Sequence, residues 1–239
     1  MLLTHAKTWY GVFQKLLLKK LKGHQDYMFI SLEGIEGCGK TTQLEYLSTF
    51  LDDTGRAYVV TREPGGTAIG KKIRSILLDP ASRELVPKAE LLLYMADRAQ
   101  HIESLIRPRL AEGSIVVCDR YFDATVVYQG IARGLDAAII RDMHRIILDD
   151  LKPDITLLLD LPPRIGLARA WQELNNGSRS DSESRFEEEA ISFHEKVRAG
   201  YLELAGLEPE RFEIIDANRP LDEVQADIRK VLSTVLDLC

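Results

Sequence analysis

The sequence predicts an α/β protein of three layers, in which a five-stranded parallel sheet carries helices on both faces. Short apolar runs rich in β-branched residues recur along the chain, and segments with helical periodicity separate them. Strands that are apolar along their whole length suit a sheet covered on both faces, and helical connections suit parallel strands. The predicted strands are 28–33, 57–61, 114–118, 154–159 and 212–215.

The first predicted strand leads into an octapeptide with the spacing G-x-x-x-x-G-K-T, after which a helical apolar period begins. In such a loop, backbone N–H groups surround phosphate oxygens, the lysine places positive charge between the β- and γ-phosphates, and the threonine hydroxyl binds Mg²⁺. The helix N-terminus that follows favours negative charge. The predicted ATP-binding residues are Gly34, Ile35, Glu36, Gly37, Cys38, Gly39, Lys40, Thr41 and Thr42.

The second predicted strand is followed by Thr61-Arg62-Glu63-Pro64-Gly65-Gly66-Thr67. The Pro-Gly-Gly core of this segment predicts a turn, and its glycines also permit a close approach of the backbone to a ligand. Ligands of parallel sheets collect at the carboxyl ends of the strands. We therefore expect Arg62, and with it Arg74, to border the same cleft as the glycine loop.

Tyr94 and Arg98 lie four residues apart and would share one face of a helix. An aromatic ring beside a guanidinium group could stack on a planar base and hydrogen-bond its edge. An ordinary amphipathic helix would show the same spacing, so this pattern alone leaves both interpretations open.

The third predicted strand, 114–118, is followed directly by Asp119 and Arg120. Enzymes with a phosphate-binding loop use a carboxylate at such a strand end to hold Mg²⁺, and a guanidinium group suits a pair of phosphate oxygens. Asp160 ends a similar run, but no arginine follows it, so Asp119 is the better candidate. A structural ion pair is the alternative for Asp119 and Arg120.

Composition excludes several classes of protein. With 239 residues, 45% of them hydrophobic and 28% charged, the chain is expected to fold as a globular domain rather than to be disordered or fibrous. The net charge of −6 argues against non-specific nucleic-acid binding. Three cysteines without C-x-x-C spacing indicate neither disulfides nor zinc and fit the cytoplasm. The five histidines lack the spacing of metal ligands.

Two segments depart from the strand and helix pattern. Residues 1–27 carry lysines among apolar side chains and no acid before Asp26. They could form a basic amphipathic helix with a targeting or membrane-surface role, but the apolar run is too short to span a bilayer. We favour a loosely ordered extension in front of a single domain at 28–239. The polar stretch 175–184 predicts a loop.

Together, several of these motifs resemble the bacterial thymidylate kinases, which phosphorylate dTMP. The resemblance rests on the glycine loop and on Thr61–Thr67, Asp119-Arg120-Tyr121 and Tyr128-Gln129-Gly130. It extends from about Met28 to about residue 232 and implies a single nucleotide-kinase domain.

The resemblance also implies roles at the matching positions of the base and the sugar phosphate. Tyr94 would stack on thymine, Arg98 would reach the base O4, and Thr125 with Gln129 would read the pyrimidine edge. Arg74 and Arg120 would hold the dTMP phosphate, and Glu36 would approach the sugar 3′-hydroxyl. The implied substrate-binding residues are Glu36, Arg62, Glu63, Pro64, Arg74, Tyr94, Arg98, Arg120, Thr125, Tyr128 and Gln129.

Thymidylate kinases place an arginine either in the glycine loop or in a lid that closes over ATP. The variable loop positions here contain none, so the resemblance implies a lid arginine, with the lid around 169–187. Arg169, Arg179 and Arg185 are candidates, although Arg179 could equally be solvated surface charge. Ser184-Arg185-Phe186-Glu187 resembles the Asp-Arg-Phe-Glu element of the family. The predicted catalytic residues are Lys40, Arg120, Asp119, Arg185 and Arg169, and the predicted metal ligands are Thr41 and Asp119.

The activity implied by the resemblance is phosphorylation of dTMP to dTDP with Mg·ATP, in the supply of dTTP for DNA synthesis. A cytoplasmic homodimer that binds ATP and dTMP, but neither nucleic acid nor membrane, is expected. Another nucleotide or deoxynucleoside kinase is the first alternative. A phosphate-loop ATPase that acts as a switch for a partner is the second.

Overall fold

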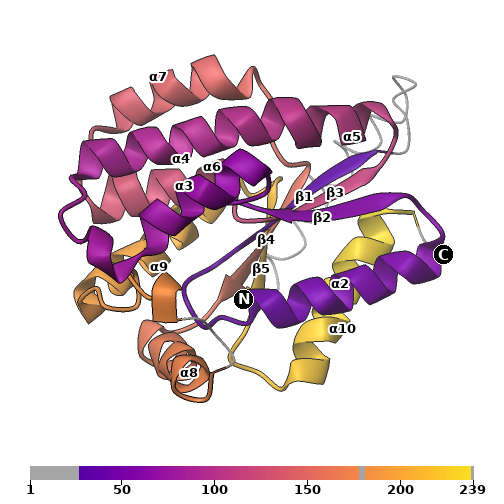
Figure 1. The fold of residues 1–239 in the computed structure, drawn as a ribbon. Coiled ribbons are helices and arrows are strands. Elements are labelled where there is room, and N and C mark those ends of the chain that lie inside the picture. Colours follow the sequence, from indigo (N-terminus) through magenta and orange to yellow (C-terminus); the bar gives the residue numbers. More distant parts are fainter. Residues whose placement is uncertain (1–26, 178–180, 238–239) are drawn as a thin grey trace.

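The computed structural model describes residues 27–177 and 181–237. Its centre is a five-stranded sheet in which all paired strands are parallel, in the order β2-β3-β1-β4-β5, and helices lie on both sides of it (Figure 1). The predicted fold class is thereby confirmed. The strands are β1 (Met28–Glu33), β2 (Tyr58–Arg62), β3 (Ile115–Asp119), β4 (Ile155–Asp160) and β5 (Phe212–Asp216).

Three predicted strands begin and end one residue before the observed ones, and the predicted strand 212–215 ends one residue early. The hydrophobic runs stop before Arg62, Asp119, Asp160 and Asp216, whereas each of these residues still belongs to its strand. Pairing explains the difference: Arg62 is in register with Asp119, and Asp160 with Asp216. Backbone pairing thus continues into polar residues, none of which is buried.

Helical segments connect the strands. They are α2 (Lys40–Thr54), α3 (Ala68–Leu78), the short η1 (Pro80–Ser82), α4 (Pro87–His101), the π-helical η2 (Ile102–Ile106), α5 (Arg107–Ala111), α6 (Phe122–Thr125), the π-helical η3 (Val126–Ala132), α7 (Ala137–Leu148), α8 (Pro163–Asn175), the short η4 (Asp181–Glu183), α9 (Ile191–Leu207) and α10 (Leu221–Val235).

Side chains of β1 alternate between the two faces of the sheet, as the pleat requires. Ile30 and Leu32 join a core cluster that includes residues of α2 and α10. Phe29 joins a second cluster with Ile102 and Ile106 of η2 on the opposite side. Figure 1 shows α2 and α10 on one side of the sheet and α4, α5 and α7 on the other. Because the paired strands are all parallel, their carboxyl ends meet at one edge of this sheet.

Some predictions concern parts of the chain that the structure does not describe. The N-terminal extension up to residue 26 and Arg179 lie outside the described residues. No helix within 27–177 and 181–237 combines the length and the apolar character needed to cross a membrane.

Candidate active site

A cavity of about 540 Å³ lies at the carboxyl edge of the sheet. Its walls come from the glycine loop after β1, the turn after β2, the end of β3, and from α4, α6 and η3. Among the predicted residues, Gly34, Ile35, Arg169 and Arg185 do not line it. Those that do are Glu36, Gly37, Cys38, Gly39, Lys40, Thr41, Thr42, Arg62, Glu63, Pro64, Arg74, Tyr94, Arg98, Asp119, Arg120, Thr125, Tyr128 and Gln129.

The glycine loop closes on itself and packs against α8. Lys40 Nζ donates hydrogen bonds to the carbonyl oxygens of Gly34 (3.1 Å) and Ile35 (3.0 Å). Gly37 has a φ of +66°, and a Cβ there would stand 2.0 Å from the carbonyl oxygen of Gly166. Only glycine fits both conditions. The start of α8 therefore lies directly against the loop predicted to hold the donor phosphates.

Asp119 fits the predicted magnesium site. It lines the cavity together with Thr41, and its Oδ1 atom is buried without a hydrogen-bond partner among the described residues. A buried carboxylate oxygen normally has a partner, so a cation or a cation-bound water suits it. No cluster of three or more His, Cys, Asp or Glu side chains that could hold a metal occurs in the described part of the chain. The carboxylate of Asp119 and the hydroxyl of Thr41 suit Mg²⁺, which is usually bound through one or two carboxylates together with substrate phosphates.

Glu36 joins the loop to the opposite wall of the cavity. Its Oε1 atom accepts from Arg120 Nη2 (2.9 Å) and from the Tyr128 hydroxyl (2.6 Å), and its Oε2 atom lies 3.0 Å from His194 Nδ1. Burial alone would raise the pKa of Glu36, but the hydrogen bond from His194 and the charge of Arg120 hold it well below its ordinary value. The loop thus presents an ionised carboxylate, a hydrogen-bond acceptor.

Arg120 contacts both the glycine loop and Tyr128 of η3. Its Nη1 atom donates to the carbonyl oxygen of Gly34 at 2.8 Å, and its guanidinium group lies over the ring of Tyr128, 4.9 Å from the centroid. Arg74 also lines the cavity, and it makes a bidentate ion pair with Glu183 of η4 at 2.8 and 2.7 Å. A phosphate bound at Arg74 would therefore compete with Glu183 or share the guanidinium group with it.

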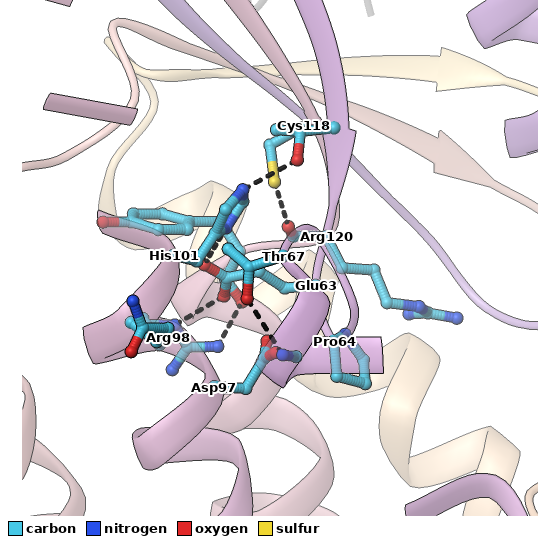
Figure 2. A network of polar contacts seen from close by, with 12 residues as sticks. Glu63, Pro64, Thr67, Asp97, Arg98, His101, Cys118 and Arg120 are labelled. Atoms are coloured by element: carbon cyan, nitrogen blue, oxygen red, sulfur yellow. Dashed lines mark hydrogen bonds and ion pairs between the residues drawn. The ribbon is translucent and has the colours of Figure 1, made fainter. Parts of the chain in front are cut away.

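Glu63 centres a buried polar network beneath the turn after β2. It accepts from Arg98 Nε at 2.7 Å and lies 2.9 Å from His101 Nδ1, and both side chains point toward the Glu63 carboxylate in Figure 2. His101 Nε2 in turn lies 2.7 Å from Thr61 Oγ1. The charges of Glu63 and Arg98 compensate each other, and both side chains are buried.

Arg98 retains little hydrogen-bonding capacity for a ligand. Besides Glu63 it reaches Thr125 Oγ1 (3.0 Å), His144 Nε2 (3.3 Å) and the carbonyl oxygen of Tyr121 (3.2 Å). Because a guanidinium group has five N–H donors, one Nη2 hydrogen remains. His144 must accept from Arg98, and it is neutral: burial, followed by the charge of Arg98, lowers the pKa of His144 to about 3.

His144 is expected to make stability depend on pH. In the unfolded chain its pKa is near 6.5, and in the folded protein about 3, so below pH 6.5 the unfolded state binds a proton that the folded state does not. Stability should fall by about 1.4 kcal/mol per pH unit as the pH drops through this window. Urea unfolding at pH 7 and pH 5 measures it. His144→Phe should remove this part of the slope, and equal slopes in both proteins would contradict the assignment.

Glu90 of α4 joins the base side of the cavity to the predicted lid. It accepts from Gln129 Nε2 at 2.8 Å and from Arg185 Nη2 at 2.5 Å. Arg185 also donates from Nε to the carbonyl oxygen of Leu77 at 2.5 Å and is buried. The structure therefore brings Arg185 to α4 rather than to the glycine loop. Arg169 lies on α8 and reaches the carbonyl oxygen of Ala217 at 3.4 Å.

Several residues of this site carry no signal in the sequence. Glu90, His101, His144 and His194 are buried and contact predicted site residues. None belongs to a recognisable motif. His194 lies 158 positions from its partner Glu36, a separation that no local pattern can bridge. Of these four, only His101 could have been suspected from the sequence, because it lies one helical turn after Arg98 on the same face of α4.

The parallel sheet, the glycine loop after its central strand and the adjoining polar cavity define the class of phosphate-loop nucleotide kinases. A family model described as Thymidylate kinase matches residues 32–228. The chain belongs to the thymidylate kinase family.

Individual relatives agree with this membership. A thymidylate kinase of Desulfosudis oleivorans is 56% identical over 211 residues, which cover 88% of this chain and 99% of the relative. One of Syntrophotalea carbinolica is 51% identical over 210 residues, or 88% of this chain and 97% of the relative. The crystal structure of thymidylate kinase from Ehrlichia chaffeensis superposes with a TM-score of 0.69 at 30% identity and covers 86% of this chain and 98% of its own.

Proposed function

We propose that this protein transfers the γ-phosphoryl group of Mg·ATP to dTMP and forms dTDP and ADP, a step in the supply of dTTP. The observation that carries the proposal is the shared cavity that Lys40, Asp119, Tyr94 and Gln129 all line. One wall suits a triphosphate with its cation, and the other suits a planar base. Membership of the thymidylate kinase family selects thymine as that base.

The proposed mechanism depends on position and charge, because the acceptor phosphate is already an adequate nucleophile. Lys40, Arg120 and a lid arginine would neutralise the charge that develops on the transferred group. Thr41 and Asp119 would hold Mg²⁺, which would neutralise part of the phosphate charge. Glu36 would accept a hydrogen bond from the acceptor sugar. Exclusion of water from the cavity would limit the loss of phosphoryl groups to hydrolysis.

An acceptor panel tests the proposed specificity. Purified protein should be assayed with Mg·ATP and equal concentrations of dTMP, dUMP, dCMP or AMP, and ADP formation should be followed. We expect dTMP to be the fastest substrate. A preference for AMP would contradict the proposed base site and favour another nucleotide kinase. ATP hydrolysis that is equally fast without any acceptor would favour a switch ATPase.

Substitution of Arg120 by glutamine should lower kcat/KM for dTMP by about 10²-fold, the usual effect of removing a donor that neutralises developing charge. The side chain would lose its bonds to the carbonyl oxygen of Gly34 and to Glu36. Steady-state kinetics with varied dTMP measures the effect. Arg229→Gln on α10, an exposed arginine outside the cavity, is the control and should leave kcat/KM unchanged. Wild-type kinetics in Arg120→Gln would contradict its role.

We also propose a homodimer in the cytoplasm. Exposed apolar side chains lie on the neighbouring helices α3 and α4, which pack together, and an exposed apolar patch of this kind often marks a protein interface. The side chains are Ile69, Ile76 and Leu92. Cys38 and Cys118 are free buried thiols, as expected in a reducing compartment. Sedimentation equilibrium of the purified chain would give the mass of a dimer, and the mass of a monomer would contradict the proposal.

A further inference from the structure

Glu90 is a buried carboxylate that makes no bond to the glycine loop. Only 1% of its surface is exposed. Its Oε1 atom accepts from Gln129 Nε2 at 2.8 Å and from Arg133 Nε at 3.3 Å, and its Oε2 atom accepts from Arg185 Nη2 at 2.5 Å. Two guanidinium groups thus compensate one buried carboxylate, and a neutral amide shares the same acceptor.

The contact with Glu90 fixes which way the Gln129 amide points. An ionised carboxylate has acceptors only, so the NH₂ group of Gln129 must face Glu90. The carbonyl oxygen then faces away from Glu90. Gln129 lines the cavity, and among the described residues no donor hydrogen-bonds its Oε1 atom. An acceptor without a partner is therefore available to the base of a bound nucleotide.

We propose that Glu90 is a positioning residue that sets base specificity by holding the Gln129 carbonyl oxygen toward the bound base. In this orientation Gln129 accepts a hydrogen bond from the N3–H group of thymine or uracil. Cytosine has a lone pair at N3 instead of an N–H group. Its N3 and the Gln129 oxygen would then be two acceptors that face each other without a proton between them. The inference rests on the proposed function, because it requires that the pyrimidine of the acceptor lies at Gln129.

Glu90 differs in its role from the charged groups around it. Arg133 and Arg185 compensate the negative charge of Glu90. Gln129 is a neutral partner, and Glu90 fixes the orientation of its side-chain amide. Removing one arginine leaves the carboxylate, and with it the amide orientation. Glu90→Gln replaces the carboxylate by an amide and removes the constraint, because the new amide could either donate to or accept from Gln129.

The experiment compares kcat/KM for dTMP and for dCMP in wild type, Glu90→Gln and Arg133→Gln. The wild-type arm tests the proposed function by itself, since dTMP must be preferred there. In Glu90→Gln the dTMP to dCMP ratio should fall by about 10- to 100-fold, the scale of one misdirected buried hydrogen bond. Arg133→Gln should keep the ratio. An unchanged ratio in folded Glu90→Gln would overturn the proposal even if dTMP remains the substrate.

Two further measurements show whether Glu90 acts through Gln129. Glu90→Gln combined with Gln129→Met should be no less selective than Gln129→Met alone, because residues that act as one unit are not additive. If Glu90→Gln does not fold, NMR of the Gln129 side-chain amide in the wild-type protein tests the proposed orientation instead. The amide signal, assigned through Gln129→Met, should show one ¹⁵N-bound proton that stays hydrogen-bonded to Glu90 and protected from exchange before and after dTMP is added. Rapidly exchanging protons, or a reversal of the amide on binding, would overturn the proposal.

Discussion

Lys40→Ala is expected to lower kcat by about 10³-fold, at the upper end of what one charge-stabilising donor contributes. The Lys40 ammonium group lies inside the glycine loop, 3.1 and 3.0 Å from two loop carbonyl oxygens, and is the only lysine that lines the cavity in the described part of the chain. No neighbouring cation from the loop can replace it, because the variable loop positions contain no arginine.

Single-turnover kinetics with saturating Mg·ATP and dTMP would measure the effect of Lys40→Ala on the chemical step. Lys196→Ala is the matched control, since this lysine is exposed on α9 and does not line the cavity. It should react at the wild-type rate. Retention of most of the wild-type rate in Lys40→Ala would contradict the donor-phosphate role of the loop.

Arg169→Ala should lower kcat by about 10³-fold, as arginines that reach a transferring phosphoryl group do, and should change KM for dTMP little. Two facts favour Arg169 over Arg185. Arg169 lies one helical turn after Gly166, the residue of α8 that packs on the glycine loop. Arg185 is buried in its pair with Glu90 and would have to break it before reaching the donor.

The variant Arg169→Ala has a matched control on the same helix. Arg164 of α8 is exposed, so Arg164→Ala changes the charge of α8 without removing the candidate side chain. It should leave kcat unchanged.

We expect Arg185→Ala to raise KM for dTMP, since it takes one cation from Glu90. Full turnover in Arg169→Ala would show that another group supplies the charge.

Motifs confined to short segments could be predicted from the sequence because their chemistry is local. The glycine loop, the strand ending at Asp119 and the helix face with Tyr94 and Arg98 all line one cavity. The glycine loop was recognisable from its spacing, whereas the roles of Asp119, Tyr94 and Arg98 remained open without the family resemblance. The strand positions were also predicted to within one residue, since buried parallel strands leave long apolar runs.

Contacts between distant segments could not be predicted in this way. Glu90 and His194 hold Gln129 and Glu36 from other helices, and a lone buried acid or histidine has no pattern. The partner of Arg185 could not be predicted for the same reason. Its segment resembles a lid element, but its pairing with Glu90 depends on how that segment packs on α4. Burial and partner choice are properties of the packed chain rather than of one segment.

Product analysis tests the proposed activity most directly. The protein should be incubated with Mg·ATP and dTMP, and ADP, dTDP and inorganic phosphate should be quantified together by ³¹P NMR. We predict equal amounts of ADP and dTDP, almost no inorganic phosphate, and almost no ADP when dTMP is omitted. ADP that accumulates with inorganic phosphate and without dTDP would contradict phosphoryl transfer to dTMP.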